Sequence, residues 1–212
     1  MARRMDPATS CVPQRRARRP CRRHKSSPAP PHAPPVAGRV QRPLGAVREY
    51  QGVEWSPNKS ARPAGVPIDT IVLHATVGKF DGAVAWCMNP ESKVSYHYII
   101  SKTGQVHQLV PLNRQAWHAG VCRMTIGGKT VKNVNARSIG IALENRNDGV
   151  DPYPDDQVEA LINLIEQLKG QVRSLRYLVS HAEVAYPRGR KSDPKGLNLA
   201  PIRARTELRG QG

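Results

Sequence analysis

The sequence predicts a single α/β domain, in which a mixed central β-sheet is flanked by helices, preceded by a disordered basic N-terminal arm. Short apolar runs rich in β-branched residues alternate with helical patterns from about residue 50 onward. The chain of 212 residues is long enough for one ordinary domain with additional sequence at an end. We therefore expect an arm at residues 1–44, the domain at 45–205 and a short tail at 206–212.

The first half of the predicted domain holds a strand, a helix and a hairpin. Residues 70–74 are apolar and β-branched, which is typical of a buried strand. Residues 81–90 predict a short helix, with Asp81 as its N-cap. The segments YHYIIS (96–101) and VHQLVP (106–111) flank a turn that contains glycine, and they predict a β-hairpin.

The second half predicts two more strands around a long helix. A glycine pair at 127–128 marks a loop, and SIGIAL at 138–143 reads as a buried strand. Residues 154–169 place their large aliphatic side chains on one stripe, which predicts an amphipathic helix closed by Gly170. Residues 176–180 predict the last strand, because they form another short apolar run.

The predicted arm carries most of the net charge. Residues 1–44 hold eleven lysines and arginines against one acid, Asp6, which is +10 of the net charge of +17. They also hold nine of the 19 prolines and few large apolar residues, so they cannot bury enough surface to offset their chain entropy. A solvated basic arm attracts nucleic acid, anionic lipid and acidic envelope polymers alike. The alternative is an extension without a role, or sequence upstream of the true start.

Several protein classes are disfavoured by what the sequence lacks. The four cysteines have no CxxC spacing, so we expect free thiols rather than a disulfide framework or a zinc knuckle. No run approaches the roughly 18 apolar residues of a transmembrane helix. The basic start is not followed by the apolar core of a secretory signal, and we therefore expect a protein that is cytoplasmic when synthesised.

Two histidines and one aspartate occupy positions suited to a metal site. His74 and His181 each end an apolar run, so parallel strands would project both rings from one edge of the sheet. Asp193 follows His181 in a loop long enough to fold back. Imidazole and carboxylate suit zinc, whose catalytic sites commonly use three protein ligands and leave one coordination position open. Taken alone, each histidine is better explained as a core or capping residue than as a ligand; together, the two favour a metal site.

Five spaced motifs make the chain recognisable: PIDTIVLHAT, NPESKVSYHYIISKTGQVHQLVP, AWHAG, NARSIGIALEN and SHAEVAYPRGRKSDP. From about residue 54 to 200 the chain resembles the zinc-dependent N-acetylmuramoyl-L-alanine amidases of the type 2 family. These share a fold with phage amidase-type lysozymes and peptidoglycan recognition proteins. The resemblance implies that His74, His181 and Asp193 are the three zinc ligands, although the loop between the last two is about two residues longer than in the compact family loop.

The resemblance also implies which residues handle protons. Lys191 matches the lysine two residues before the third ligand, and it would stabilise the oxyanion. Many bacterial members carry a glutamate where this chain has Ala142, so another group must act here. Tyr96 matches a tyrosine used near the metal in the phage lysozyme branch. Glu144 is the alternative, since a residue two positions along a strand lies on the same face.

Other polar and aromatic residues of these motifs have less defined roles. Trp117 and His118 in AWHAG match a family segment that lines the substrate groove, so we expect substrate binding there; the alternative is a turn held by packing. His97 and His107 lie on the predicted hairpin and match no ligand position. We expect both of them to be structural.

These observations predict a zinc-dependent amide hydrolase. Its substrate would be peptidoglycan or a muropeptide, cleaved between N-acetylmuramic acid and L-alanine, with Zn²⁺ as the cofactor. We expect a monomer, with the arm touching anionic envelope polymers and with release to the cell wall through a separate pore. One alternative is a peptidoglycan-binding protein that has lost catalysis, although all three ligands are present. Specific nucleic-acid binding is disfavoured, because the arm has almost no aromatic residues on which bases could stack.

Overall fold

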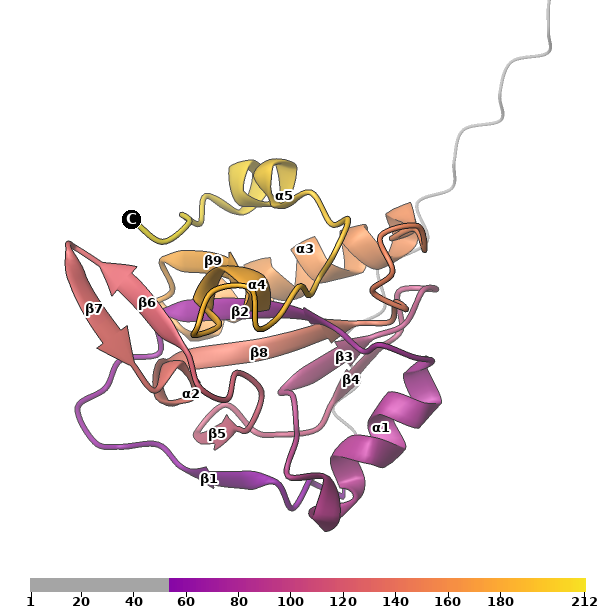
Figure 1. The fold of residues 1–212 in the computed structure, drawn as a ribbon, viewed down its shortest axis with the longest axis horizontal. Coiled ribbons are helices and arrows are strands. Elements are labelled where there is room, and N and C mark those ends of the chain that lie inside the picture. Colours follow the sequence, from indigo (N-terminus) through magenta and orange to yellow (C-terminus); the bar gives the residue numbers. More distant parts are fainter. Residues whose placement is uncertain (1–53) are drawn as a thin grey trace, which may run out of the picture. The chain divides into compact units, whose positions relative to one another are not determined.

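The structure of the protein is a computed structural model that describes residues 54–212 (Figure 1). The predicted arm, residues 1–44, lies outside the described residues. Within the described part, a mixed central sheet is flanked by helices, so the predicted α/β fold is confirmed. No helix of residues 54–212 is both long enough and apolar enough to cross a membrane.

The central sheet has five strands in the order β4-β3-β8-β2-β9. The strand β2 (Thr70–Ala75) lies beside the central strand and pairs in parallel with both β8 (Ser138–Leu143) and β9 (Tyr177–Ser180). The strand β3 (Tyr98–Ile100) is parallel to β8, and β4 (Val106–Gln108) pairs antiparallel with β3 at the edge. The predicted hairpin is therefore confirmed. Because β2, β8 and β9 run in the same direction, their carboxyl ends meet at one edge of the sheet.

The largest apolar cluster lies between the sheet and the helices α3 (Asp155–Gln171) and α5 (Leu199–Thr206). The stripe predicted for residues 154–169 faces this core, since Leu161 and Ile165 are wholly buried. The helix continues through Gly170, so its predicted end is wrong by two residues. Gly170 does not adopt the positive φ with which a glycine commonly ends a helix, and the C-cap is Val172.

The opposite face of the sheet is covered by shorter elements. The helix α1 (Phe80–Met88) packs near β3, and its Cys87 is buried with Ile99 and Ala142. Its observed N-cap is Lys79, so the predicted capping role of Asp81 is wrong; Asp81 lies in the first turn, where a negative charge favours the helix dipole. Figure 1 shows α1 on the opposite side of the sheet from α5.

The remaining elements are short and mostly surround this second face. They are β1 (Lys59–Ala61), η1 (Pro90–Ser92), β5 (Arg114–Ala116), β6 (Arg123–Ile126), β7 (Lys129–Lys132), α2 (Val134–Arg137) and α4 (His181–Val184). The predicted loop at 127–128 is the turn of the β6–β7 hairpin, in which both glycines have positive φ, as tight hairpin turns require. Sequence patterns had predicted neither strand of this hairpin.

The strand β8 carries large side chains on one face of the sheet and small side chains on the other. Its large residues point into the main core beside α3, and they are Ile139, Ile141 and Leu143. Its small residues Gly140 and Ala142 alternate with them and therefore lie on the other face. In parallel register, Ala142 is the partner of His74 on β2. The small side chains of β8 thus leave room beside His74 for further groups.

Candidate metal centre and active site

His74, His181 and Asp193 come together at the carboxyl edge of the sheet. His74 lies near the end of β2, and His181 is the first residue of α4, directly after β9. Asp193 comes from the loop that follows α4, and its Oδ2 lies 3.1 Å from Nδ1 of His74 and 3.0 Å from Nδ1 of His181. One ligand atom from each residue lies within 4.8 Å of the others, and all three residues are buried. The predicted juxtaposition is thus observed.

Local backbone structure fixes the position of His181. Ser180 is the N-cap of α4: its Oγ accepts a hydrogen bond from the backbone N–H of Glu183 at 3.1 Å. In return, the Glu183 carboxylate accepts the backbone N–H of Ser180 at 2.6 Å, which completes a capping box. The backbone N–H of Ala182 donates to the carbonyl of Asp193 at 3.0 Å. These hydrogen bonds at the start of α4 therefore fix two of the three candidate ligands, His181 and Asp193, relative to each other.

The outer nitrogen of His181 shows which edge of the ring is free to bind a cation. Nε2 of His181 lies 3.1 Å from the carbonyl oxygen of Ala119. A carbonyl oxygen only accepts hydrogen bonds, so Nε2 carries the ring proton in the neutral form. The lone pair is then on Nδ1, which faces Asp193. Histidine ligands of metals typically make this kind of outer hydrogen bond.

Protonation states also fit a metal site. Burial lowers the pKa of His74 to about 4, so its imidazole is neutral at pH 7. One nitrogen each of His74 and His181 and a carboxylate oxygen of Asp193 therefore converge in a buried place. This set is one that zinc prefers, in the number found at its catalytic sites.

Tyr96 lies against the candidate metal centre. Its ring centroid is 5.0 Å from that of His74. Burial, reinforced by the neighbouring Cys87 and Asp193, raises the pKa of the Tyr96 phenol. The hydroxyl therefore stays protonated at neutral pH, and it can donate a hydrogen bond to a negatively charged oxygen.

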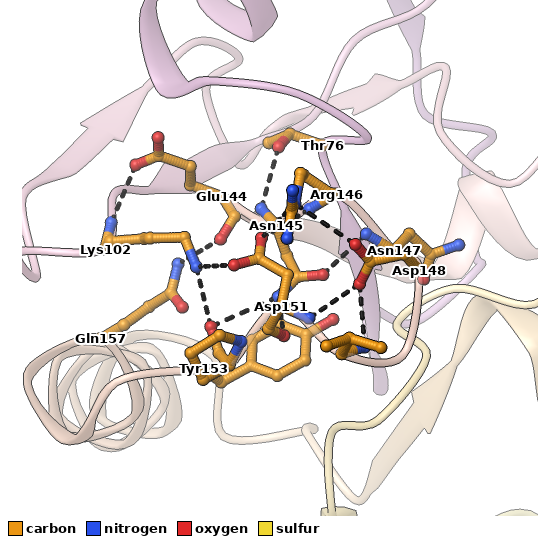
Figure 2. Close-up of polar contacts among 12 residues, drawn as sticks. Thr76, Lys102, Glu144, Asn145, Arg146, Asn147, Asp148, Asp151, Tyr153 and Gln157 are labelled. Atoms are coloured by element: carbon orange, nitrogen blue, oxygen red, sulfur yellow. Dashed lines mark hydrogen bonds and ion pairs between the residues drawn. The ribbon is translucent and has the colours of Figure 1, made fainter.

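Glu144 is turned away toward the β3–β4 turn. Figure 2 shows its carboxylate directed at Lys102, whose backbone N–H donates to Oε2 of Glu144 at 2.9 Å. The strand β8 ends at Leu143, so the alternation that would place Glu144 beside Ala142 no longer governs its side chain. Of the two residues expected to handle protons, the structure places Tyr96 beside His74 and engages Glu144 elsewhere.

Lys191 is exposed on the loop that carries Asp193, and its positive charge adds to the effect of burial in lowering the pKa of His74. The other side of this loop is held by Asn147, which is drawn in Figure 2. Oδ1 of Asn147 accepts the backbone N–H of Lys195 at 2.6 Å, and Nδ2 donates to Oγ of Ser192 at 3.1 Å. The longer loop after α4 is anchored by Arg190, which donates to the carbonyl oxygen of Ala119 at 3.2 Å.

Residues 64–196 match the family described as N-acetylmuramoyl-L-alanine amidase (Amidase_2). The chain belongs to this family. It is 31% identical over 166 residues to the N-acetylmuramoyl-L-alanine amidase AmiD of Escherichia coli K12, an alignment that covers 71% of this chain and 57% of AmiD. It is 35% identical over 97 residues to the 1,6-anhydro-N-acetylmuramyl-L-alanine amidase AmpD of Enterobacter cloacae, covering 45% of this chain and 48% of AmpD. The chain thus spans about half the length of these relatives.

The fold of this Amidase_2 chain is also similar to solved structures. AmiD from E. coli, in complex with anhydro-N-acetylmuramic acid-L-Ala-D-γ-Glu-L-Lys, superposes with a TM-score of 0.58 at 29% sequence identity. That comparison covers 69% of this chain and 60% of AmiD. The family and the fold expected from the five motifs are both confirmed.

Next to Tyr96, this Amidase_2 domain has a cavity of about 410 Å³ between α1 and the loop after β2. Its lining includes Thr76, Val77, Trp86 and Tyr96. Trp86 is 56% exposed and Val77 is 68% exposed, so both offer apolar surface to a ligand. The cavity therefore runs along α1 and is bordered on one side by Tyr96.

Trp117 and His118, expected in the substrate groove, lie on different sides of their segment. Nε1 of Trp117 donates to Oγ of Ser60 at 3.0 Å, and its backbone N–H donates to Oγ of Ser95 at 3.0 Å. His118 is only 6% exposed and lies behind His74, with Nδ1 3.0 Å from Nε2 of His74. A role of either residue in substrate binding stays a prediction, and the position of His118 points to another role.

The other two histidines of residues 54–212, His97 and His107, lie outside the candidate ligand set. His97 is wholly buried, and its Nδ1 accepts the backbone N–H of Gly140 at 3.0 Å, a contact that ties β8 to the residue before β3. His107 lies on β4, with its ring centroid 6.3 Å from that of Phe80.

Two groups of this site were missed by sequence reasoning. They are the carbonyl of Ala119, which contacts His181, and the hydroxyl of Ser138, which lies 3.0 Å from Nε2 of His118. One signal was available, because a glycine inside a buried strand marks a close approach by another group. Gly140 is such a residue, and the group that approaches it is the ring of His118.

Proposed function

We propose that this Amidase_2 protein is a zinc-dependent hydrolase of the amide between N-acetylmuramic acid and L-alanine in peptidoglycan or muropeptides. The observation that carries the proposal is the convergence of His74, His181 and Asp193, buried and aimed at a common point. The names of the aligned relatives support the same bond, since AmiD and AmpD are both described as amidases of muramyl-L-alanine.

His74 and His181 would hold the zinc ion through Nδ1, and Asp193 through its carboxylate. When bound, zinc polarises the scissile carbonyl and makes water a better nucleophile by lowering its pKa from about 15.7 towards 7. Burial lowers the pKa of His74 to about 4, so its imidazole is unprotonated at pH 7, as binding of a metal requires. The side chains that would then contact the reacting carbonyl group are Tyr96 and Lys191.

Tyr96 would donate a hydrogen bond to the oxygen that becomes negative as the carbonyl is attacked. Its raised pKa suits a donor, since the phenol stays protonated. Lys191 would place a positive charge at the open side of the site, and one such donor contributes about 3 kcal/mol to transition-state stabilisation. Glu144 is the weaker candidate, because its carboxylate already accepts a backbone N–H from Lys102 at 2.9 Å.

The cavity beside Tyr96 would receive part of the muropeptide. Its apolar walls, including Trp86 and Val77, suit the face of a sugar or an alkyl segment of the stem peptide. The compound in the AmiD complex, anhydro-N-acetylmuramic acid-L-Ala-D-γ-Glu-L-Lys, is a suitable first substrate for assay. Trp117 does not line this cavity; it stays a predicted contact for another part of the substrate, and its two N–H groups are held by serine side chains.

The proposal is tested by measuring new amino-terminal alanine from a soluble muropeptide and from purified cell wall. Activity should disappear on dialysis against a chelator and return with zinc. His181→Ala should lose both zinc and hydrolysis, while His107→Ala, which removes a histidine outside the site, should keep both. Normal turnover by H181A with one zinc still bound would contradict the ligand assignment. Binding to cell wall without any release of alanine would instead favour a peptidoglycan-binding protein that has lost catalysis.

We propose in addition that the basic arm concentrates the enzyme on anionic cell envelopes, on the basis of its eleven lysines and arginines against one acid. Deleting residues 1–44 should leave hydrolysis of a soluble muropeptide unchanged. The same deletion should weaken binding to whole cell wall at low salt, because the attraction of solvated charges is screened as salt rises. Equal wall binding by both proteins across a salt series would argue against this role.

A further inference from the structure

A row of buried polar groups runs behind His74, on the side away from Asp193. Nε2 of His74 lies 3.0 Å from Nδ1 of His118, and Nε2 of His118 lies 3.0 Å from Oγ of Ser138. The Ser138 hydroxyl lies 2.6 Å from the carbonyl oxygen of Val134. Ser138 is wholly buried and His118 is 6% exposed, so water does not compete for these contacts.

The backbone end of this row fixes the direction of its hydrogen bonds. The carbonyl oxygen of Val134 only accepts, so the single hydroxyl proton of Ser138 points to it. The Ser138 oxygen must then accept the hydrogen bond from His118, and Nε2 of His118 carries the proton of that ring. The other nitrogen of His118, Nδ1, is left with a lone pair.

The matching of donors to acceptors also gives the direction of the hydrogen bond between His118 and His74. Since Nδ1 of His118 accepts, Nε2 of His74 must donate to it and carries the ring proton of His74. Nδ1 of His74 then presents its lone pair 3.1 Å from Oδ2 of Asp193, as Nδ1 of His181 does at 3.0 Å. Three electron-pair donors facing one another repel unless a cation lies between them, so this arrangement suits a bound metal.

The backbone of β8 makes space for this row. A Cβ added to Gly140 would lie 2.5 Å from Cγ of His118 and 2.9 Å from its Nδ1. Any side chain at this position would therefore push the imidazole out of line with His74. The conformation of Gly140 is not one reserved for glycine, so close approach is the reason that a glycine suits this place.

We propose that His118 and Ser138 are positioning residues of the metal centre, which hold His74 in the tautomer whose Nδ1 is free to bind the metal. This inference rests on the proposed zinc site and adds two residues behind it. It gives His118 a structural task beneath the site in place of contact with substrate. Outer hydrogen bonds of this kind contribute about 10–100-fold to metal affinity.

The first test is zinc affinity, measured by competition with a chromophoric chelator. His118→Ala should weaken zinc binding about 10–100-fold. His118→Asn should recover part of that loss, because an amide oxygen can accept the proton of His74 near the place of Nδ1. Ser138→Ala should also weaken binding. Its control is Ser56→Ala, which removes the hydroxyl of another wholly buried serine, one that donates to the carbonyl of Cys87 at 2.6 Å, and should leave zinc affinity unchanged.

The second test reads the tautomers directly. In the zinc-loaded wild-type protein, two-bond ¹⁵N–¹H couplings should show His118 protonated on Nε2 and unprotonated on Nδ1. A proton on Nδ1 of His118 would reverse the row and overturn the inference. Wild-type zinc affinity in H118A, or an equal loss in S56A and S138A, would overturn it as well.

These outcomes are separate from failure of the proposed function. If the wild-type protein binds no zinc, the proposed zinc hydrolase itself is wrong. If it binds zinc and hydrolyses the muropeptide while H118A retains full zinc affinity, only the role assigned to His118 and Ser138 is wrong.

Discussion

Replacing Gly140 by alanine should destabilise the protein, although the change adds only one methyl group. The added Cβ would lie 2.5, 2.7 and 2.9 Å from Cγ, Cδ2 and Nδ1 of His118, whereas carbon atoms in contact prefer about 3.5–4.0 Å. The ring cannot simply retreat, because both of its nitrogens lie 3.0 Å from partners, His74 and Ser138.

Two terms set the size of the effect. Overpacking a well-packed interior by a methyl group costs about 1–3 kcal/mol. Displacing the His118 ring would weaken two buried hydrogen bonds, each with a net contribution of about 1 kcal/mol. We therefore expect Gly140→Ala to lower the free energy of unfolding by about 2–4 kcal/mol.

The chain offers a matched control for this change. Gly170 lies in the last turn of α3, is exposed, and has no atom within 4 Å of an added Cβ. Gly170→Ala should raise the free energy of unfolding by about 0.5–1 kcal/mol, because alanine loses less backbone entropy than glycine on entering a helix.

Both free energies are measured by urea unfolding of chelator-treated protein, followed by circular dichroism at constant pH, so that metal binding does not contribute. The two glycine-to-alanine changes should move the midpoint in opposite directions. A G140A protein as stable as the wild type would show that His118 does not occupy the space over β8.

Three further predictions concern parts of the domain around the site. Burial, and then the charge of Arg62, lower the pKa of His97 to about 3, so below pH 6.5 the unfolded chain binds a proton that the folded chain excludes. The free energy of unfolding should therefore fall by up to about 1.4 kcal/mol per pH unit from pH 6.5 towards 3, and His97→Gln should reduce that slope in urea titrations. Ser180→Ala, which removes the N-cap of α4, should cost about 1 kcal/mol in thermal unfolding and lower zinc occupancy through His181, whereas unchanged occupancy would show that the cap does not position that ring. Ile165→Ala, at a wholly buried place under the sheet, should cost about 2–5 kcal/mol in urea unfolding without altering zinc affinity, and a change in zinc affinity would show that the two faces of the sheet are coupled.

Repeating patterns in the sequence predicted the larger elements because those patterns report burial within one element. The aliphatic stripe of α3 and the apolar run of β8 were recognisable for this reason. The β6–β7 hairpin was missed, since one of its strands, KTVK, is exposed at three of its four residues and shows no long apolar run. The errors at Asp81 and Gly170 were each of two residues, at helix ends where alternative caps differ little in energy.

By itself, the sequence determined the fold class, the family and the three residues that converge at the carboxyl edge of the sheet. His74 and His181 could be found because each ends a local apolar run, and Asp193 because it follows within a short loop. The tertiary structure alone decided that Glu144 turns to Lys102 while Tyr96 lies beside His74. It also decided that His118 lies beneath the site, within hydrogen-bonding distance of His74 and Ser138, which are 44 and 20 residues away in the sequence. Local patterns cannot report such contacts, because the direction of a hydrogen bond depends on the partners that packing brings to each ring.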